Sequence, residues 1–242
     1  MSVSVQPIPI LSDNYAWLLM EPNAGIVGIV DPGEAAPVVA TLTAQGQGLD
    51  FIFLTHHHHD HIGGVPALLE TYPQARVVGH DNDANRLPKL DIPVHEGSMV
   101  AFGMASVRVI ETPGHTRGHV AYYIADGGIL LTGDTLFSLG CGRLFEGSAA
   151  DLFDSLAKFS ELPNATQICA GHEYSAGNAK FALSVDPDNK ALKTRAKEIE
   201  TLRARHLPTL PVSLGEERAT NPFLRAPTIA ALAHLRAAKD VF

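Results

Sequence analysis

The sequence is poor in cysteine and lacks long apolar segments. Only two cysteines, Cys141 and Cys169, occur among 242 residues, which is too few for a disulfide framework and typical of a chain in a reducing compartment. No run of about 18 apolar residues occurs, and the first residues show no basic stretch followed by an apolar one. We therefore expect a cytoplasmic protein that neither spans nor binds a membrane.

Positive charge is also in deficit, with 18 Lys and Arg against 26 Asp and Glu and a formal net charge of -8. This balance opposes nucleic-acid phosphates at long range, so we expect a small-molecule partner rather than nucleic acid. Hydrophobic residues make up 45% of the chain, enough for a substantial core in an ordinary globular protein. We expect a monomer.

Short β-branched runs alternate with helical patterns through the first two thirds of the chain. The predicted strands lie near the start and at 24–31, 49–55, 75–80, 106–112, 120–126 and 127–134. The predicted helices follow Pro37, cover 62–73 and begin again at Asp151. From Glu173 onward the pattern is almost entirely helical, so we predict an α/β catalytic domain over 1–173 and a helical substrate-binding domain over 174–242.

A dense group of ionisable side chains follows the predicted strand at 49–55. The segment THHHHDH places His56, His58, Asp60 and His61 in a loop at the end of that strand, where loops commonly present catalytic groups. Imidazoles two residues apart in an extended segment project to the same side and can bind one ion. His57 and His59 would then point outward as surface or supporting groups. A solvated polar loop is the alternative interpretation of this segment.

Three more candidate ligands stand where later strands end, each beside a glycine: His115 in TPGHT, Asp134 in TGDT and His172 in AGHEY. Their repetition favours a metal site over isolated structural residues. Nitrogen and carboxylate ligands without thiolate suit Zn(II), Fe(II) or Mn(II). Thr55 and His119 are candidates to orient the ligands through hydrogen bonds, although a purely structural hydrogen bond is an equal alternative for His119.

These residues resemble the metallo-β-lactamase superfamily, and within it glyoxalase II, the hydroxyacylglutathione hydrolases. The resemblance covers nearly the whole chain. It rests on THHHHDH with the later ligands, and on IPILSDNYAWLL, GCGRLFEG, AGHEYSAGNAKFA and TNPFLR. It implies an αβ/βα sandwich with a small C-terminal helical domain. It also implies cytoplasmic hydrolysis of S-(D-lactoyl)glutathione and related 2-hydroxyacylglutathiones, the second step of methylglyoxal detoxification.

By the same resemblance, two divalent metal ions, zinc in the first place and iron or manganese as alternatives, would share seven ligands. One ion would be held by His56, His58 and His115, and the other by Asp60, His61 and His172, with Asp134 between them. Asp60 and Asp134 would also count as catalytic residues. Two close cations lower the pKa of a shared water and so supply hydroxide near neutral pH. A thiol of pKa about 8.5 to 9 then leaves without a strong acid.

The resemblance also assigns substrate contacts to Arg143, Phe145, Tyr174, Arg236 and Lys239. Glutathione carries two carboxylates, which fixed cations can bind. Arg236 and Lys239, three residues apart on one helix face, match the pair that binds the glycine carboxylate. Considered without the family, they would be ordinary charges near a helix C-terminus. Phe145 stands where the family often has tyrosine, so one hydroxyl contact to the substrate is expected to be missing.

Three other functions fit parts of the pattern. A mononuclear iron persulfide dioxygenase would use the same histidine motif for oxidation. A structural metal site is a weaker fit, because such sites are usually closed and rich in cysteine. A β-lactamase would need an export signal. The helical C-terminal segment with TNPFLR and the basic pair favours the thioester hydrolase.

Overall fold

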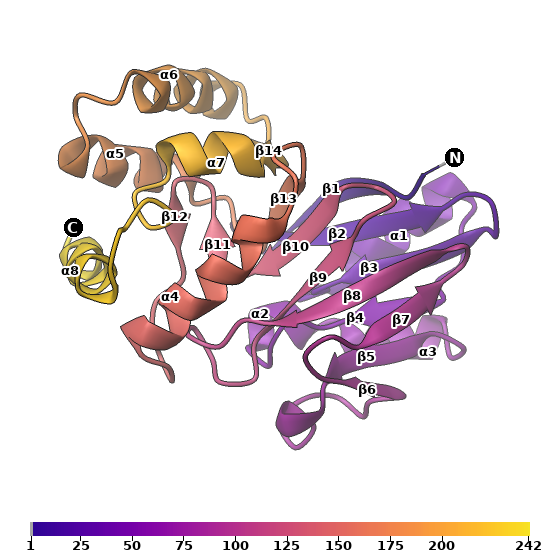
Figure 1. Ribbon diagram of the computed structural model, residues 1–242. Coiled ribbons are helices and arrows are strands. Elements are labelled where there is room, and N and C mark those ends of the chain that lie inside the picture. Colours follow the sequence, from indigo (N-terminus) through magenta and orange to yellow (C-terminus); the bar gives the residue numbers. More distant parts are fainter. Residues whose placement is uncertain (1) are drawn as a thin grey trace.

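Residues 2–242 are described by the computed structural model; Met1, the first residue of the expected catalytic domain, lies outside the described residues. Two six-stranded sheets form the body of the protein, and helices gather on its flanks and at one end (Figure 1). The expected αβ/βα sandwich is therefore confirmed. None of the helices between residues 2 and 242 combines the length and apolar character that crossing a bilayer requires.

The first sheet consists of neighbouring strands in chain order. They are β1 (Ser4–Ile10), β2 (Asn14–Glu21), β3 (Ile26–Val30), β4 (Phe51–Phe53), β5 (Arg76–His80) and β6 (Ile92–Val94). The first three strands pair antiparallel and the last four pair parallel. Parallel pairing requires crossover connections, which α1 (Ala35–Gln45), α2 (His59–Ile62), α3 (Val65–Thr71) and the short η1 (Asp81–Asp83) provide.

The second sheet runs in the order β14-β13-β10-β9-β8-β7. Its strands are β7 (Met99–Phe102), β8 (Ala105–Glu111), β9 (Val120–Ile124), β10 (Ile129–Gly133), β13 (Gln167–Ala170) and β14 (Val212–Ser213). Between β10 and β13 lie a hairpin, β11 (Leu136–Phe137) and β12 (Gly140–Cys141), then α4 (Ala149–Lys158) and η2 (Phe159–Glu161). β10 and β13 pair parallel, while the other neighbours pair antiparallel.

Alternation along the strands divides the apolar residues between two cores. In β4, Phe51 and Phe53 belong to the core shared by the two sheets, whereas Ile52 belongs to the core beneath α1 and α3. The same alternation places Trp17 of β2 between the sheets and Leu18 under the helices. Successive strand side chains point to opposite faces, so a strand with both faces buried reads as a continuous apolar run.

Four helices occupy most of the chain after residue 173. They are α5 (Ser175–Val185), α6 (Lys190–Ala204), α7 (Leu214–Thr220) and α8 (Ile229–Asp240). Figure 1 shows them gathered beside the hairpin β11-β12. The strands and helices predicted from the sequence are confirmed apart from small shifts at their ends. Sequence reasoning missed several short elements: β2, β6, β7, the hairpin β11-β12, η1, α7, β14, and α2, which carries Asp60 and His61 where a loop was expected. Of these, β14 comes from the helical part and pairs with β13 of the second sheet.

Candidate metal centre and substrate cleft

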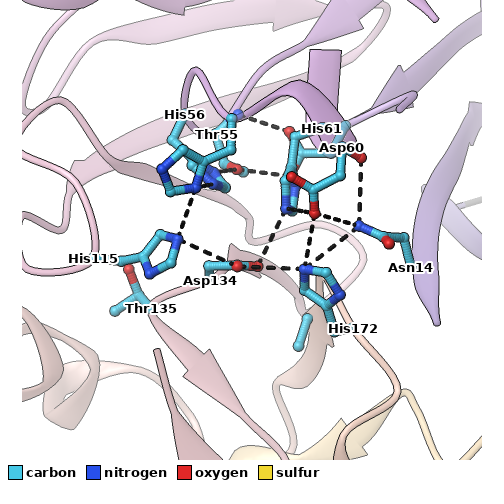
Figure 2. Close-up of polar contacts among 12 residues, drawn as sticks. Asn14, Thr55, His56, Asp60, His61, His115, Asp134, Thr135 and His172 are labelled. Atoms are coloured by element: carbon cyan, nitrogen blue, oxygen red, sulfur yellow. Dashed lines mark hydrogen bonds and ion pairs between the residues drawn. The ribbon is translucent and has the colours of Figure 1, made fainter. Parts of the chain in front are cut away.

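All seven predicted metal ligands meet at one edge of the sandwich, although they come from four separate segments. Figure 2 labels all of them except His58. Each segment begins where a strand ends: residues 54–61 follow β4, 112–119 follow β8, Asp134 follows β10 and His172 follows β13. The C-terminal ends of neighbouring strands meet at one edge of an α/β sheet and commonly carry the ligand site. The fold therefore brings together residues up to 116 positions apart, His56 and His172.

The ligand atoms form two adjacent groups. His58 Nδ1 lies 3.0 Å from Nε2 of His56 and 3.0 Å from Nε2 of His115. In the second group, Asp60 Oδ2 lies 3.4 Å from Nε2 of both His61 and His172. These are the two triads that the sequence analysis assigns to separate ions, and the donor atoms of each lie within 4.8 Å of one another.

Asp134 stands between the two groups. Its Oδ2 lies 3.4 Å from Nε2 of both His115 and His172, and its Oδ1 lies 3.5 Å from Nε2 of His61. One carboxylate therefore faces histidines of both triads. This is the arrangement that a ligand shared between two cations requires.

Outer hydrogen bonds determine which imidazole nitrogen faces the centre. The Nδ1 atoms of His61, His172 and His115 lie 3.0, 2.9 and 2.8 Å from acceptor oxygens, given respectively by Asp31, Asp13 and the carbonyl of Arg143. Each Nδ1 therefore carries a proton, so Nε2 is the nitrogen of each ring that can bind an ion at the centre.

His56 follows the same rule through a hydroxyl. Thr55 Oγ1 donates to Asp31 Oδ2 at 2.6 Å, so it can accept from His56 Nδ1 at 3.0 Å. Thr55 therefore has the orienting role for which it was a candidate. His58 is the exception, because its Nδ1 rather than its Nε2 faces the other ligands.

The donor set fits divalent metal ions. Nε2 of His61 and Oδ1 of Asp134 are buried and have no hydrogen-bond partner among residues 2–242, a state that costs free energy unless a cation or water satisfies the atoms. Burial would raise the pKa of Asp60 and Asp134, but attraction to the imidazoles of His172 and His61 outweighs it and holds both pKa values well below the usual range. Both carboxylates are thus ionised and ready to bind a cation.

The histidine pKa values differ between the two groups. Burial, followed by repulsion among imidazoles, lowers the pKa of His58 to about 4 and that of His56 well below its usual value. Burial also opposes protonation of His172, but hydrogen bonds to Asp134 and Asp60 raise its pKa to about 10. The first group therefore consists of neutral imidazoles, and the second, richer in carboxylate, favours positive charge.

Glycines beside the ligands allow this close packing. Gly133 has φ of 47°, and a Cβ there would lie 2.5 Å from Thr55 Oγ1 and 2.8 Å from His119 Nε2. A Cβ on Gly171 would lie 2.6 Å from Asp134 Oδ1. Any larger residue at either position would displace a ligand or its support, which explains the glycines beside Asp134 and His172.

The remaining histidines near the ligands, His57, His59 and His119, have three different surroundings. His59 is exposed, as expected, and His57 points away from the ligands toward Asp83, with Nδ1 3.1 Å from Oδ2. His119 is fully buried; its Nε2 accepts from the backbone N–H of Asp134 at 3.1 Å, and its Nδ1 lies 2.8 Å from Thr112 Oγ1. It therefore supports the shared carboxylate through the backbone.

A cleft of about 730 Å³ opens beside the ligands and is lined by every predicted substrate residue: Arg143, Phe145, Tyr174, Arg236 and Lys239. Two of these are aromatic and stand close to ligands. The ring of Tyr174 stacks on His172, with centroids 4.5 Å apart and planes 7° apart. Phe145, 63% exposed, presents its ring to His58 and His115.

The basic residues of α8 differ in exposure. Arg236 is only 5% exposed; its Nη1 donates to the Cys141 carbonyl at 2.9 Å and its Nη2 to Asp240 Oδ1 at 3.0 Å. Lys239 is half-buried over the rings of Phe181 and Phe242, and its ammonium donates to the Gly177 carbonyl at 3.3 Å. Burial, then the nearby cations Arg236 and Arg143, lower the pKa of Lys239.

Sequence reasoning missed the carboxylates and the amide that orient the ligands. Asp13 and Asp31 bond to His172 and His61, and Asn14 Nδ2 donates to Asp60 Oδ2 at 2.9 Å. Asp13 and Asn14 lie within the segment IPILSDNYAWLL, and Asp31 directly follows β3. The position of Asp31 after a buried strand, like that of the ligands, was the available signal.

Comparison with known proteins decides the family. A family model of the metallo-beta-lactamase superfamily matches residues 14–172, and one of the hydroxyacylglutathione hydrolase C-terminus matches 173–242. A hydroxyacylglutathione hydrolase of Ruegeria pomeroyi is 49% identical over 93% of this chain and 88% of its own length. The chain belongs to the hydroxyacylglutathione hydrolase family. Another hydroxyacylglutathione hydrolase, from Rhodopseudomonas palustris, is 47% identical over 100% of this chain and 96% of its own length.

Solved structures with the same fold are more distant. ETHE1 from Myxococcus xanthus superposes with a TM-score of 0.73 at 26% identity, covering 97% of this chain and 90% of that protein. The di-iron-bound form of TTHA1623 gives a TM-score of 0.59 at 29% identity, over 69% of this chain and 91% of its own. The curated relatives and the C-terminal match favour a hydrolase over the persulfide dioxygenase alternative.

Proposed function

We propose that this protein hydrolyses S-(D-lactoyl)glutathione, and related 2-hydroxyacylglutathiones, to the hydroxy acid and glutathione. The single observation that carries the proposal is that the cleft joins the seven-ligand cluster to the cationic residues of α8. The names of the family's close relatives, which are hydroxyacylglutathione hydrolases, point to the same substrate class. By analogy with that family, we also propose a place in methylglyoxal detoxification.

We propose a centre of two divalent ions, most simply zinc, with iron or manganese as alternatives. His56, His58 and His115 would hold one ion, Asp60, His61 and His172 the other, and Asp134 both. The existence of a di-iron form in a structural neighbour supports the count of two. When bound, such ions supply a hydroxide near neutral pH and polarise the thioester carbonyl.

The protein's own residues prepare this chemistry by fixing the ligands. Asp13, Asp31, Thr55 and the Arg143 carbonyl hold four imidazoles with their Nε2 atoms facing the centre. Because the ligands are already oriented, little reorganisation is needed when charge develops during the reaction. Asp60 and Asp134 remain ionised and are the proposed catalytic carboxylates beside the reacting water.

Substrate binding is proposed to use the other end of the cleft. Lys239 and Arg236, with Arg143, would face the carboxylates of glutathione, and Tyr174 and Phe145 would contact its peptide and acyl parts. Phenylalanine at 145 removes the hydroxyl contact that a tyrosine would give. We also propose that the catalytic part spans 1–173 and the substrate-binding part 174–242, a division supported by the family models meeting at 172 and 173.

The test is a steady-state assay of the purified, metal-loaded protein with S-(D-lactoyl)glutathione and a panel of other glutathione thioesters. We expect turnover of the lactoyl thioester, two metal ions per chain by elemental analysis, and no consumption of oxygen. Oxygen consumption on glutathione persulfide with one iron per chain would instead support the dioxygenase. Absence of turnover with every thioester would reject the proposal. Sedimentation of the purified protein tests the expected monomer, and fractionation of cells that produce the protein tests the expected cytoplasmic location.

A further inference from the structure

A second cluster of charged side chains lies beside the metal ligands and is not used by the proposed mechanism. It consists of His57, Asp83, Arg86 and Glu146, and we call it the Arg86 cluster. Its members come from the ligand loop after β4, from the segment that begins at η1, and from the loop 143–147. The cluster therefore connects the metal loop to a loop that lines the substrate cleft.

Asp83 holds Arg86 in place. Its side chain is only 4% exposed, and its Oδ1 accepts from Nη2 of Arg86 at 2.5 Å and from Nε at 3.2 Å. Its Oδ2 lies 3.1 Å from His57 Nδ1. Because Arg86 can only donate, His57 Nε2 at 3.3 Å from Nη1 accepts, and His57 Nδ1 donates to Asp83. Together the contacts with Asp83 and His57 hold the guanidinium in one orientation.

Arg86 then binds both carboxylate oxygens of Glu146. Nη1 contacts Oε1, and Nη2 donates to Oε2 at 3.2 Å. Oε2 also accepts from the backbone N–H of Arg117 at 2.8 Å. Two-point binding of a carboxylate by arginine fixes geometry as well as supplying attraction. Glu146 is thereby fixed to the segment between β8 and β9 that carries His115.

The restrained loop carries two of the proposed substrate residues, Arg143 and Phe145. The Phe145 ring stands 5.7 Å from His58 and 5.1 Å from His115, measured between centroids, although most of the side chain is exposed. Exposed aromatic rings gain little burial energy from such a position, so the backbone beside the ring is held by other contacts. The Phe145 N–H donates to the His115 carbonyl at 3.3 Å and the Gly147 N–H to the Gly114 carbonyl at 3.0 Å, and the side chain of the residue between them, Glu146, adds a further restraint.

A glycine makes room for the cluster. A Cβ at Gly118 would overlap the carboxylate of Asp83. Asp83 therefore lies directly against the backbone between His115 and His119. The cluster is therefore in direct contact with the segment that carries His115 and His119.

We propose that Arg86 is a positioning residue for substrate binding: oriented by Asp83 and His57, it holds Glu146 so that Phe145 and Arg143 meet the glutathione moiety. The identity of that moiety rests on the proposed function; the restraint on the loop does not. The proposal also gives His57, between two metal ligands in sequence, a role as a support for Arg86.

The kinetic test compares Arg86→Gln, Glu146→Gln and the double variant, all metal-loaded. We expect KM for S-(D-lactoyl)glutathione to rise about tenfold in each single variant with kcat within about twofold, as for loss of a substrate-positioning contact. The double variant should be no worse than the single ones, because both remove the same coupling. Lys158→Gln is the matched control. It breaks the ion pair between Lys158 Nζ and Glu96 Oε2, which are 2.6 Å apart, and neither residue lines the cleft.

A second readout does not depend on turnover. Amide hydrogen exchange of the metal-loaded chain should quicken over residues 143–147 in both Gln variants and stay unchanged in Lys158→Gln, with metal content equal in all. Unchanged exchange, an unchanged KM, or loss of metal with a fall in kcat would each overturn the proposal. A wild-type protein without thioesterase activity would reject the proposed function, while the exchange comparison would still decide whether Arg86 restrains the loop.

Discussion

At the scale of single residues, the ligands depend on the partners behind them. Asp31 accepts three hydrogen bonds, from the Thr55 N–H at 2.8 Å, from Thr55 Oγ1 at 2.6 Å and from His61 Nδ1 at 3.0 Å. It has φ of 52°, an uncommon conformation for a residue other than glycine. A strained backbone conformation of this kind persists only when surrounding contacts hold it in place. Here the three hydrogen bonds to the Asp31 carboxylate provide those contacts.

Asp31→Asn should weaken metal binding without unfolding the protein. An amide NH₂ facing His61 Nδ1 would drive the proton to Nε2, the atom that faces Asp60 and Asp134, so the ligand lone pair would be lost. We expect metal affinity to fall about 10- to 100-fold, the usual effect of removing an outer partner. Competition with a chromophoric chelator measures the metal affinity. The control is Asp50→Asn, because the Asp50 carboxylate accepts from the Val27 N–H and does not line the cleft. Equal affinities would contradict the assigned role.

Residue types and spacing predicted which candidate ligands would come together, but not the residues that support them. THHHHDH and the glycine-flanked residues at strand ends carry a recognisable chemical pattern, and the structure brings all seven together. Asp13 and Asp31 are single carboxylates that adjoin β2 and β3, and their partners lie 159 and 30 positions away. A contact between residues so distant depends on sheet packing, which no local pattern encodes.

At the scale of elements, α8 presents its two cations differently. Residues three apart share a helix face, yet Arg236 is buried under the Cys141 carbonyl while Lys239 reaches the cleft beside exposed Phe242. The sequence predicted the shared face. It could not predict that the carbonyl of Cys141, 95 positions earlier in the chain, accepts from the guanidinium of Arg236, because that contact depends on how deeply the helix docks.

Alanine at these two positions should therefore have different effects. Lys239→Ala is expected to raise KM about tenfold and to leave stability nearly unchanged, because a remote substrate contact is lost. Arg236→Ala should raise KM as well and also lower the free energy of unfolding by about 2 kcal/mol, because a buried carbonyl loses its charged donor. Steady-state kinetics measures the effect of each variant on KM, and denaturant unfolding measures its effect on stability. Equal stability of both variants would contradict the buried role of Arg236.

At the scale of the whole molecule, α7 joins the C-terminal helices to the hairpin β11-β12 beside the cleft. Glu217 is fully buried there and accepts from Ser138 Oγ at 2.9 Å and from the Leu139 N–H at 2.8 Å. Burial raises its pKa from 4.5 to about 7, against the lowering effect of these hydrogen bonds and of Asn221. The folded protein thus binds this proton more tightly than the unfolded chain does.

This shift predicts a pH dependence of stability. The contribution of Glu217 is greatest below pH 4.5, declines as pH rises toward about 7, and is constant above. Glu217→Gln lacks this titration, so the wild-type advantage over the variant should shrink across that range, by at most on the order of 3 kcal/mol at about 1.4 kcal/mol per pKa unit. Urea unfolding at a series of pH values measures it. Parallel profiles for the two proteins would contradict the assignment.

The short strand β14 gives the C-terminal part of the chain a share in the second sheet. Val212 and Ser213 pair with Ile168 and Gln167 of β13, the strand that leads to His172. A polypeptide shortened at residue 173 would therefore lose its covering strand as well as its substrate helices. Its bare backbone edge would be a template for intermolecular pairing, and such a fragment would aggregate rather than persist as a smaller enzyme.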